Sequence, residues 1–353
     1  MSGPERLAVL TEGLFDDHHA KTAHGVIRYG TREVVAVVDS SQAGRTASEV
    51  VPFCEKPVPI VATIAEAVER GANTLLIGVA PTGGRLDGAW RALVLEAIDR
   101  GLNVEAGLHT ILADDPEFTA AAERHGVKLR DLRLPPADLG VPRGPNSRRP
   151  GLRVVHSVGS DVAIGKKAVT VELDAAARAR GLKSVYVPTG QTGVAIAGWG
   201  IAVDHVLADY VAGAAERLVD EGGERGELLF VEGQGSLFHP AYSAVTLGLL
   251  HGSSPDLLIL AHRAGATHFS GYPDLPLPSL PELIEAYENV TRPLRPARVA
   301  AVALNTSRIA SDEEARAAVA QAEDETGLPA DDLVRFGADR VLDAVLTAFE
   351  RPD

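Results

Sequence analysis

Residues 153–169, RVVHSVGSDVAIGKKAV, decide the fold of the second half of the chain. Their apolar start predicts a buried strand, and the stretch from about Lys166 to Ala179 has the apolar spacing of a helix. In a turn between strand and helix, backbone N–H groups converge on phosphate oxygens, the helix start adds partial positive charge, and a lysine reaches the outer phosphates. The sequence therefore predicts a P-loop that binds a phosphate-bearing cofactor through Gly159, Ser160, Asp161, Gly165, Lys166 and Lys167.

This loop departs from the usual P-loop pattern in two ways. Five residues separate the two glycines instead of four, and Lys167 stands where a serine or threonine normally holds magnesium. A glycine-containing turn with an incidental lysine is the simpler interpretation of the same letters. The strand and the helix on either side favour the P-loop.

Apolar, strand-like runs alternate with helical patterns in both halves of the chain. The runs are LAVL at 7–10, VVAVVD at 34–39, TLLIGVA at 74–80, NVEAGLH at 103–109, RVVHSVG at 153–159, SVYVPTG at 184–190, LLFVEGQG at 228–235, DLLILAHRAG at 256–265 and RVAAVALNTS at 298–307. Helical patterns cover residues 64–70, 87–99, 166–179 and about 205–220. This alternation predicts an α/β protein with parallel sheets.

A proline-rich segment separates the two halves. Residues 134–150 contain five prolines and show no sustained periodicity, so they continue neither a helix nor a central strand. We therefore expect one α/β domain over residues 1–133, a linker over 134–150 and the P-loop domain over 151–353.

Composition excludes several classes of function. The single cysteine, Cys54, rules out a disulfide framework or a multi-cysteine zinc site within the chain. A formal charge of −14 repels the nucleic-acid backbone. No apolar run is long enough for a membrane span, and the N-terminus lacks a signal-peptide core. We expect a cytoplasmic protein, a homo-oligomer, that acts on a small molecule and binds neither nucleic acid nor membrane.

Two segments resemble dethiobiotin synthetase. The loop GSDVAIGKK is similar to the G-T-D-x-x-x-G-K-T loop that binds ATP in that enzyme, and VEGQGS at 231–236 looks like its V-E-G-A-G-G segment. The resemblance implies that Glu232, together with Asp161, holds magnesium if ATP is used. It also implies that Asn305, at the end of the VAAVALN run, reads adenine. A carboxylate at the end of a parallel strand faces the crevice where such sheets bind ligands, although Glu232 could also be a solvent-exposed strand cap.

Nearly the whole chain resembles the D-glutamate N-acetyltransferase-like family, long catalogued as a domain of unknown function. The resemblance rests on GSDVAIGKK, on the segments that begin VPTGQTGVAIAGWG and VEGQGSLFHPAYSAVTLGLLHG, and on KTAHGVIRYG with VVAVVDS near the N-terminus. It implies a Rossmann-like N-terminal domain, a C-terminal P-loop domain and acetyl transfer from acetyl-CoA to D-glutamate. Lys167 and Ala168 leave no hydroxyl after Lys166, which favours CoA phosphates held by charge over ATP with magnesium.

Polar residues near the ends of the runs are candidates for the acceptor site and for proton transfer. Thr189, Gln191 and Thr192 form a plausible pocket wall, and Tyr242 follows nearby. His239 is the candidate general base that takes a proton from the attacking amine, with His262 as the competitor. The predicted catalytic residues are His239, Glu232 and Lys166. Arg28 and Arg263, with Lys21, are candidates to hold substrate carboxylates.

The N-terminal half gives weaker signals. Asp39 ends a strand where a Rossmann acid would take a ribose hydroxyl, but no GxGxxG follows the first strand, so NAD is not expected. His18 and His19 follow Asp16 and Asp17, and this group is more often solvated than metal-binding.

Two functions compete most closely. The first is an N-acyltransferase with acetyl-CoA in the P-loop and a small, acidic amino acid such as D-glutamate as acceptor. The second is an ATP- and magnesium-dependent amide ligase or kinase of dethiobiotin synthetase type. A binding protein without turnover is disfavoured by the polar residues at several strand ends, and a nicotinamide oxidoreductase by the missing glycine fingerprint.

Overall fold

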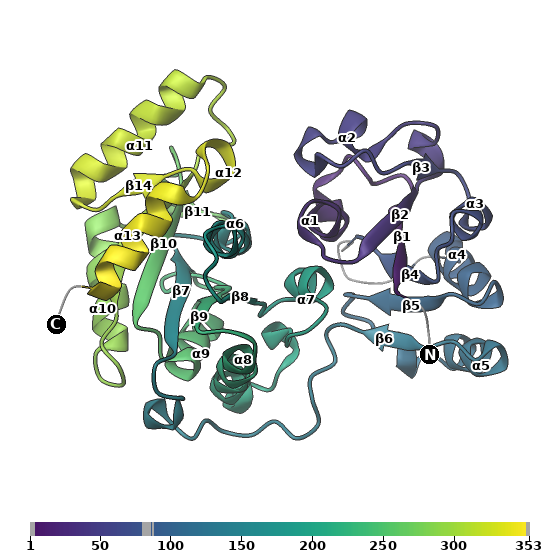
Figure 1. Cartoon of the computed structure of the whole chain (residues 1–353), viewed down its shortest axis with the longest axis horizontal. Helices are drawn as coiled ribbons and strands as arrows, with labels where there is room; N and C mark the ends of the chain where they lie inside the picture. Colours follow the sequence, from purple (N-terminus) through teal and green to yellow (C-terminus); the bar gives the residue numbers. More distant parts are fainter. Residues whose placement is uncertain (1–3, 80–85, 87, 351–353) are drawn as a thin grey trace. The chain divides into compact units, whose positions relative to one another are not determined.

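The computed structural model describes residues 4–79, 86 and 88–350, and these form two compact units. One unit contains the chain up to Pro135 together with Gly190–His205 (Figure 1). The other contains Pro136–Thr189 and the chain from Val206 onward. Residues 190–205 follow the predicted linker at 134–150 in the sequence, but they belong to the first unit; we call this segment the excursion 190–205. It includes α7 (Gln191–Ala197), which packs so closely on α1 (Lys21–Tyr29) that a Cβ at Gly25 would lie 3.0 Å from Ile196.

The first unit has a six-stranded parallel sheet in the order β3-β2-β1-β4-β5-β6. The strands are β1 (Arg6–Leu10), β2 (Glu33–Val38), β3 (Ile60–Val61), β4 (Thr74–Ile77), β5 (Asn103–Ala106) and β6 (Leu129–Asp131). Strand order 3-2-1-4-5-6 is that of the Rossmann fold, so the implied Rossmann-like architecture is confirmed.

Helices of the first unit begin and end where the sequence supplies caps. They include α2 (Ala47–Val50), α3 (Ile64–Glu69), α4 (Gly88–Asp99) and α5 (Pro116–His125). The Thr63 side chain caps α3, Asp115 caps α5, and Gly126 ends α5 in the left-handed conformation. The helices expected over 64–70 and 87–99 are thus confirmed as α3 and α4, with Asp87 outside the described residues.

The second unit has a six-stranded parallel sheet in the order β14-β13-β10-β7-β9-β8. Its strands are β7 (Arg153–Gly159), β8 (Ser184–Val187), β9 (Leu228–Val231), β10 (Leu257–Arg263), β13 (Arg298–Asn305) and β14 (Ala330–Asp331). The strand that leads into the predicted P-loop, β7, lies between β10 and β9. The α/β class with parallel sheets is confirmed in both units.

Helices cover both faces of the second sheet (Figure 1). One apolar cluster joins the sheet to α6 (Lys166–Ala179), α12 (Leu333–Phe336) and α13 (Asp339–Glu350). A second cluster, on the other face, contains residues of α9 (Ser243–Ser253), α10 (Leu280–Thr291) and α11 (Asp312–Thr326). The sheet is therefore buried on both sides, and its open positions are at the strand ends.

Short elements escaped the sequence analysis. Strands β3, β6, β14 and the small antiparallel pair β11 (His268–Phe269) and β12 (Tyr272–Pro276) have only two to five residues each, too few for a periodic signal. The helix expected over about 205–220 is α8 (Val211–Arg225), because two short 3₁₀ turns, Val203–His205 and Ala208–Tyr210, precede it.

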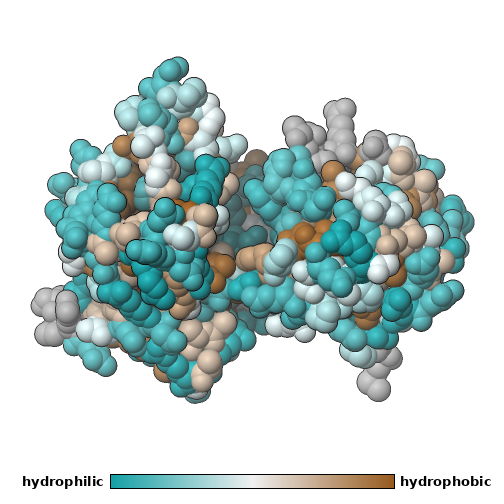
Figure 2. Space-filling view, turned by 90° about the horizontal axis from the view of Figure 1, so that it is seen from above, coloured by the Kyte–Doolittle hydropathy of each residue, from teal (hydrophilic) through white to brown (hydrophobic). Residues whose placement is uncertain are grey.

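The surface of both units is largely hydrophilic in the view of Figure 2, with apolar residues in small groups. No helix within residues 4–79, 86 and 88–350 is long and apolar enough to cross a membrane.

Candidate functional site

The loop between β7 and α6 has the backbone that the sequence predicts. Strand β7 ends at Gly159, and α6 begins at Lys166. Gly165 has φ of 111°, a value that only glycine adopts without strain. No side chain caps the N-terminus of α6, so the helix start presents its N–H groups and partial positive charge to the loop.

The Lys166 ammonium is buried at the centre of this loop. Its Nζ donates to the Asp161 carbonyl oxygen at 2.6 Å. Burial lowers the pKa of Lys166 to about 8, a shift that the negative charges of Asp161 and Glu232 oppose and Arg263 reinforces. Because burial disfavours the charged form of Lys166, a bound anion would stabilise that form strongly.

Two side chains from neighbouring strand ends hold the carbonyl groups of the loop. Arg263, at the end of β10, donates through Nη2 to the Ala163 carbonyl at 2.6 Å. Asn305, at the end of β13, donates through Nδ2 to the Ile164 carbonyl at 2.9 Å. Across the described residues, we find no hydrogen-bond acceptor for the backbone N–H groups of Ala163, Ile164 and Gly165. The loop thus has satisfied carbonyls and unsatisfied donors, which suits an anion.

Arg308 adds a cation that the sequence analysis did not single out. It follows β13, which is the sheet neighbour of β10, and its charge lowers the pKa of Arg263 further after the larger effect of burial. In the described part of the chain the Arg308 side chain has no hydrogen bond or ion pair. Three cations therefore influence one another electrostatically at the carboxyl ends of the strands: Lys166, Arg263 and Arg308. An arginine a few residues after an apolar strand was the only signal in the sequence.

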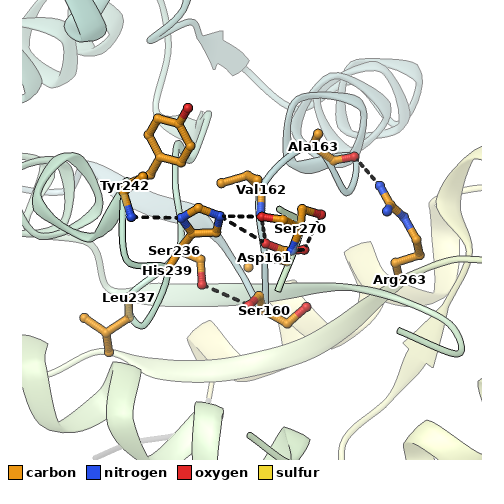
Figure 3. A network of polar contacts seen from close by, with 12 residues as sticks. Ser160, Asp161, Val162, Ala163, Ser236, Leu237, His239, Tyr242, Arg263 and Ser270 are labelled. Atoms are coloured by element: carbon orange, nitrogen blue, oxygen red, sulfur yellow. Dashed lines mark hydrogen bonds and ion pairs between the residues drawn. The ribbon is translucent and has the colours of Figure 1, made fainter. Parts of the chain in front are cut away.

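Asp161 is committed to contacts within the protein (Figure 3). One carboxylate oxygen accepts from the Ser270 amide at 2.9 Å and from the Ser270 hydroxyl at 2.6 Å. The other oxygen accepts from the Val162 amide at 2.7 Å. These bonds tie the β11–β12 turn to the P-loop and use the lone pairs that the predicted magnesium site would need.

Hydroxyl ligands for magnesium are also absent from the first helical turn. Lys167 and Ala168 follow Lys166, and the next hydroxyl, on Thr170, donates back to the Lys167 carbonyl at 2.8 Å. The donor set at the loop therefore fits phosphates held by cations and N–H groups better than it fits a phosphate-bridging metal.

His239 is buried, and both of its ring nitrogens make hydrogen bonds (Figure 3). Nδ1 accepts from the Ala241 amide at 3.2 Å, so the neutral ring carries its proton on Nε2 and donates it to the Ser270 carbonyl at 3.2 Å. Tyr242 packs over the ring, with centroids 4.9 Å apart, and is half-exposed. The neutral ring has no open lone pair in this arrangement, which suits a positioning role better than that of a base.

His262 differs from His239 in this respect. Its Nδ1 lies 2.9 Å from the Ser160 hydroxyl, and its Nε2 makes no hydrogen bond with any described residue. Burial lowers the pKa of His262, and the opposing charge of Glu325 is the smaller effect. The ring is therefore neutral near pH 7 and contacts the P-loop directly.

Glu232 follows β9 and is buried against β8. Its Oε2 accepts from the Tyr186 hydroxyl at 2.7 Å and from the Thr189 amide at 3.2 Å. Burial raises the pKa of Tyr186 well above its ordinary value, so this hydroxyl stays a donor. Gly233 is required next, because a Cβ there would lie 1.7 Å from the Ser157 carbonyl oxygen. Glu232 thus has a fixed carboxylate within electrostatic reach of Lys166.

The other predicted substrate residues lie in the first unit. The Thr192 hydroxyl is 2.8 Å from that of Thr22, and Gln191 begins α7. Arg28 donates to Glu55 at 2.5 Å and to the Phe53 carbonyl at 3.0 Å. Lys21, at the start of α1, is exposed. These residues are not brought together with Lys166 inside the second unit, so their assignment to the acceptor stays a prediction.

The acid and histidine groups of the first unit have local roles. Asp17 caps the 3₁₀ turn His18–Ala20 by accepting from the His19 amide at 2.8 Å. Ligand atoms of Asp17, His18 and His19 lie within 4.8 Å of one another. Asp39 is buried and accepts from Thr11, Phe15 and Ser41.

Tyr287 is a positioning residue that the sequence did not reveal. Its buried hydroxyl donates to the Gly159 carbonyl at 2.7 Å and accepts from the Leu237 amide at 3.0 Å. It therefore joins the start of the P-loop to the loop after Glu232. A tyrosine on the apolar face of a helix is usually a core residue, so no sequence pattern indicated that Tyr287 contacts the P-loop.

Known proteins resemble this chain over almost its full length. Residues 143–342 match the P-loop domain, and residues 40–135 the Rossmann-like domain, of the domain of unknown function DUF1611. A D-glutamate N-acetyltransferase from Tritonibacter scottomollicae is 40% identical over 285 residues, which are 80% of this chain and 84% of that protein. A D-glutamate N-acetyltransferase from a Pseudoalteromonas species is 38% identical over 218 residues, which are 62% of this chain and 64% of that protein.

A solved structure extends the match to the fold. The crystal structure of a DUF1611 protein from Anabaena variabilis has 40% sequence identity and a TM-score of 0.90, covering 97% of this chain and 99% of that one. The two-unit architecture is therefore shared with that protein, and the chain is a member of the DUF1611 family.

Proposed function

We propose that the protein transfers the acetyl group of acetyl-CoA to the amino group of D-glutamate. The enzyme class rests on curated relatives at 38 to 40% identity that are named D-glutamate N-acetyltransferase, and the chain is an N-acyltransferase. The donor and the roles of individual residues are inferred from the site.

The observation that carries the proposal is the P-loop with a buried lysine and no adjacent hydroxyl. Lys166 and the N–H groups of residues 163–165 supply donors for a pyrophosphate. Arg263 and Arg308 supply further positive charge beside the loop. CoA combines a pyrophosphate with a separate ribose phosphate, so it matches two adjoining groups of cations better than a single triphosphate chain does.

The reaction requires one proton to be removed from the amine. The ammonium group first loses one proton to a base. The neutral nitrogen then attacks the thioester carbonyl and forms the C–N bond, the C–S bond breaks, and a second N–H proton ends on the sulfur, so CoA leaves as its thiol. We assign this base to Glu232, because Tyr186 and Thr189 fix its carboxylate while His239 uses both ring nitrogens for hydrogen bonds. Its place at the carboxyl end of β9 faces the crevice where parallel sheets bind ligands.

The sharpest test compares donors and acceptors in parallel. The protein is incubated with acetyl-CoA and EDTA together with D-glutamate, L-glutamate, D-aspartate or D-leucine, and thiol release and product mass are followed. A second set contains ATP, magnesium and acetate instead of acetyl-CoA. We expect N-acetyl-D-glutamate from the first set. Equal rates for glutamate and leucine would contradict the acceptor, and a product formed only with ATP and magnesium would contradict the donor.

A further inference from the structure

A large basic cavity lies in the second unit, away from the P-loop. Its volume is about 1090 Å³. Six arginines line it: Arg148, Arg149, Arg153, Arg292, Arg295 and Arg298. Among the described residues that line it, the carboxylates are Asp256 and Glu288, two against six arginines.

The cavity lies at the amino ends of the strands, whereas the P-loop lies at their carboxyl ends. Arg153 begins β7, whereas Gly159 ends it and opens the P-loop. Leu257 and Arg298, which also line the cavity, begin β10 and β13. At ~3.3 Å per residue, the length of β7 separates the two edges by roughly 20 Å. The cations of the cavity and those of the P-loop therefore lie at opposite ends of the same strands.

The two described carboxylates of the lining pair with only some of these arginines. Asp256 accepts from Arg148 at 2.6 Å and from Arg295 at 2.7 Å, and it also accepts from the Val154 amide. Glu288 accepts from the Val299 amide at 2.9 Å. Both carboxylates therefore have fixed partners in the wall of the cavity.

Three of the arginines have no carboxylate partner within residues 4–79, 86 and 88–350. Arg149 contacts only the Gly226 carbonyl, at 3.3 Å, and Arg153 lies over the ring of Phe349, with its guanidinium carbon 5.5 Å from the centroid. The Arg292 side chain makes no hydrogen bond or ion pair with any described residue. No described carboxylate therefore balances the charge of these three lining residues.

We infer that this cavity is a second anion site, which binds a small phosphate-bearing polyanion. Guanidinium groups bind phosphate oxygens in pairs, and several arginines around one cavity suit a ligand with more than one phosphate. The volume is that of a site for an organic molecule and exceeds what a single inorganic phosphate fills. The site is independent of the P-loop and of the acetyl transfer proposed above.

Inorganic pyrophosphate and ADP are suitable probes, because they share the charged group and only ADP adds a nucleoside. Binding is measured by calorimetry on Lys166→Ala, in which the P-loop has lost its central cation. We expect one remaining site in this variant. Tighter binding of ADP would assign the cavity to a nucleotide, and equal binding to an anion recognised by charge alone, and both results support the proposal.

The second step removes the cavity charges. In the Lys166→Ala background, Arg153→Gln with Arg292→Gln is expected to weaken pyrophosphate binding by about tenfold or more, since each loses a charge-assisted hydrogen bond. Arg124→Gln, an exposed arginine in the last turn of α5, is the matched control and should leave binding unchanged. Circular dichroism checks that the double variant folds.

Two results would overturn the inference. The first is that Lys166→Ala alone abolishes all pyrophosphate binding, which would leave the P-loop as the one anion site. The second is that the double substitution leaves pyrophosphate binding unchanged but alters the molar mass measured by light scattering. That outcome would make the cavity an interface between copies of the chain.

Discussion

The loops after β1 and after β7 occupy equivalent places in two parallel sheets, but they use their polar groups differently. In the first unit, the buried Asp39 at the end of β2 accepts from the Thr11 hydroxyl at 3.2 Å and the Phe15 amide at 3.1 Å, so a carboxylate of the protein itself bonds to this loop. In the second unit, the N–H groups of residues 163–165 have no acceptor among the described residues, and Lys166 is buried beside them. The same architecture therefore places a buried carboxylate beside one loop and a buried ammonium group beside the other.

The largest expected effect concerns Glu232. Glu232→Gln keeps the shape of the side chain but removes the proton acceptor, so we expect kcat to fall by roughly 10² to 10⁴. The dissociation constant of acetyl-CoA should stay within about threefold if, as proposed, the P-loop holds the phosphates. Steady-state kinetics and calorimetry measure the two quantities. An unchanged kcat would transfer the role to His262, for which His262→Gln is the corresponding test.

The next prediction concerns Arg308. If Arg308 contacts the ribose phosphate of CoA, its substitution should affect only ligands that carry this phosphate. Arg308→Gln is expected to weaken acetyl-CoA binding about tenfold, since one charge-assisted contact is lost. Acetyl-dephospho-CoA, which lacks the ribose phosphate, should bind the variant and the wild type alike. If the substitution weakens both ligands equally, Arg308 acts through the overall field and not on the ribose phosphate.

The pH dependence of binding tests the state of Lys166. Its pKa in the free protein is lowered to about 8, and the charged form binds phosphate. Binding should therefore weaken as pH rises through 8, by about tenfold between pH 7 and pH 9. Lys166→Arg stays charged over this range and should remove the dependence. A flat profile in the wild type would contradict a titrating lysine in the cradle.

Asp39, in the first unit, is expected to affect stability and not acetyl-CoA binding. Asp39→Asn weakens a buried group of hydrogen bonds, so we expect the free energy of unfolding to fall by about 1 to 3 kcal/mol. Acetyl-CoA binding should not change. Denaturant unfolding and calorimetry make the comparison. A variant that loses acetyl-CoA binding while keeping its stability would show that the first loop also serves the donor.

The sequence predicted the fold well because the long elements carry periodic signals. Strand β7, helix α6 and the runs that became β9, β10 and β13 were identified from apolar spacing and glycine positions. The excursion 190–205 was missed because its packing on α1 depends on contacts between residues far apart in the chain. Two-residue strands such as β3 and β14 were missed because they form only beside an existing edge.

The sequence predicted the part of the site that lies in local motifs, and it missed the contacts that depend on tertiary packing. Lys166 and Glu232 belong to local motifs, and the structure brings them within electrostatic reach of each other. That Asn305 reads adenine stays a prediction. Its bond to the Ile164 carbonyl was not foreseen, because no local pattern reveals it. The hydrogen bonds of His239 and the positions of Tyr287 and Arg308 depend on tertiary packing.

The central claim is that the P-loop holds the phosphates of acetyl-CoA by charge, without a metal. Calorimetric titration of acetyl-CoA in EDTA, with wild type and Lys166→Ala side by side, tests it most directly. The matched control is Lys183→Ala, which removes an exposed lysine paired with Glu227. We predict tight binding to the wild type and the control, and binding weaker by on the order of 10- to 100-fold in Lys166→Ala. Equal affinity in all three proteins would contradict the account.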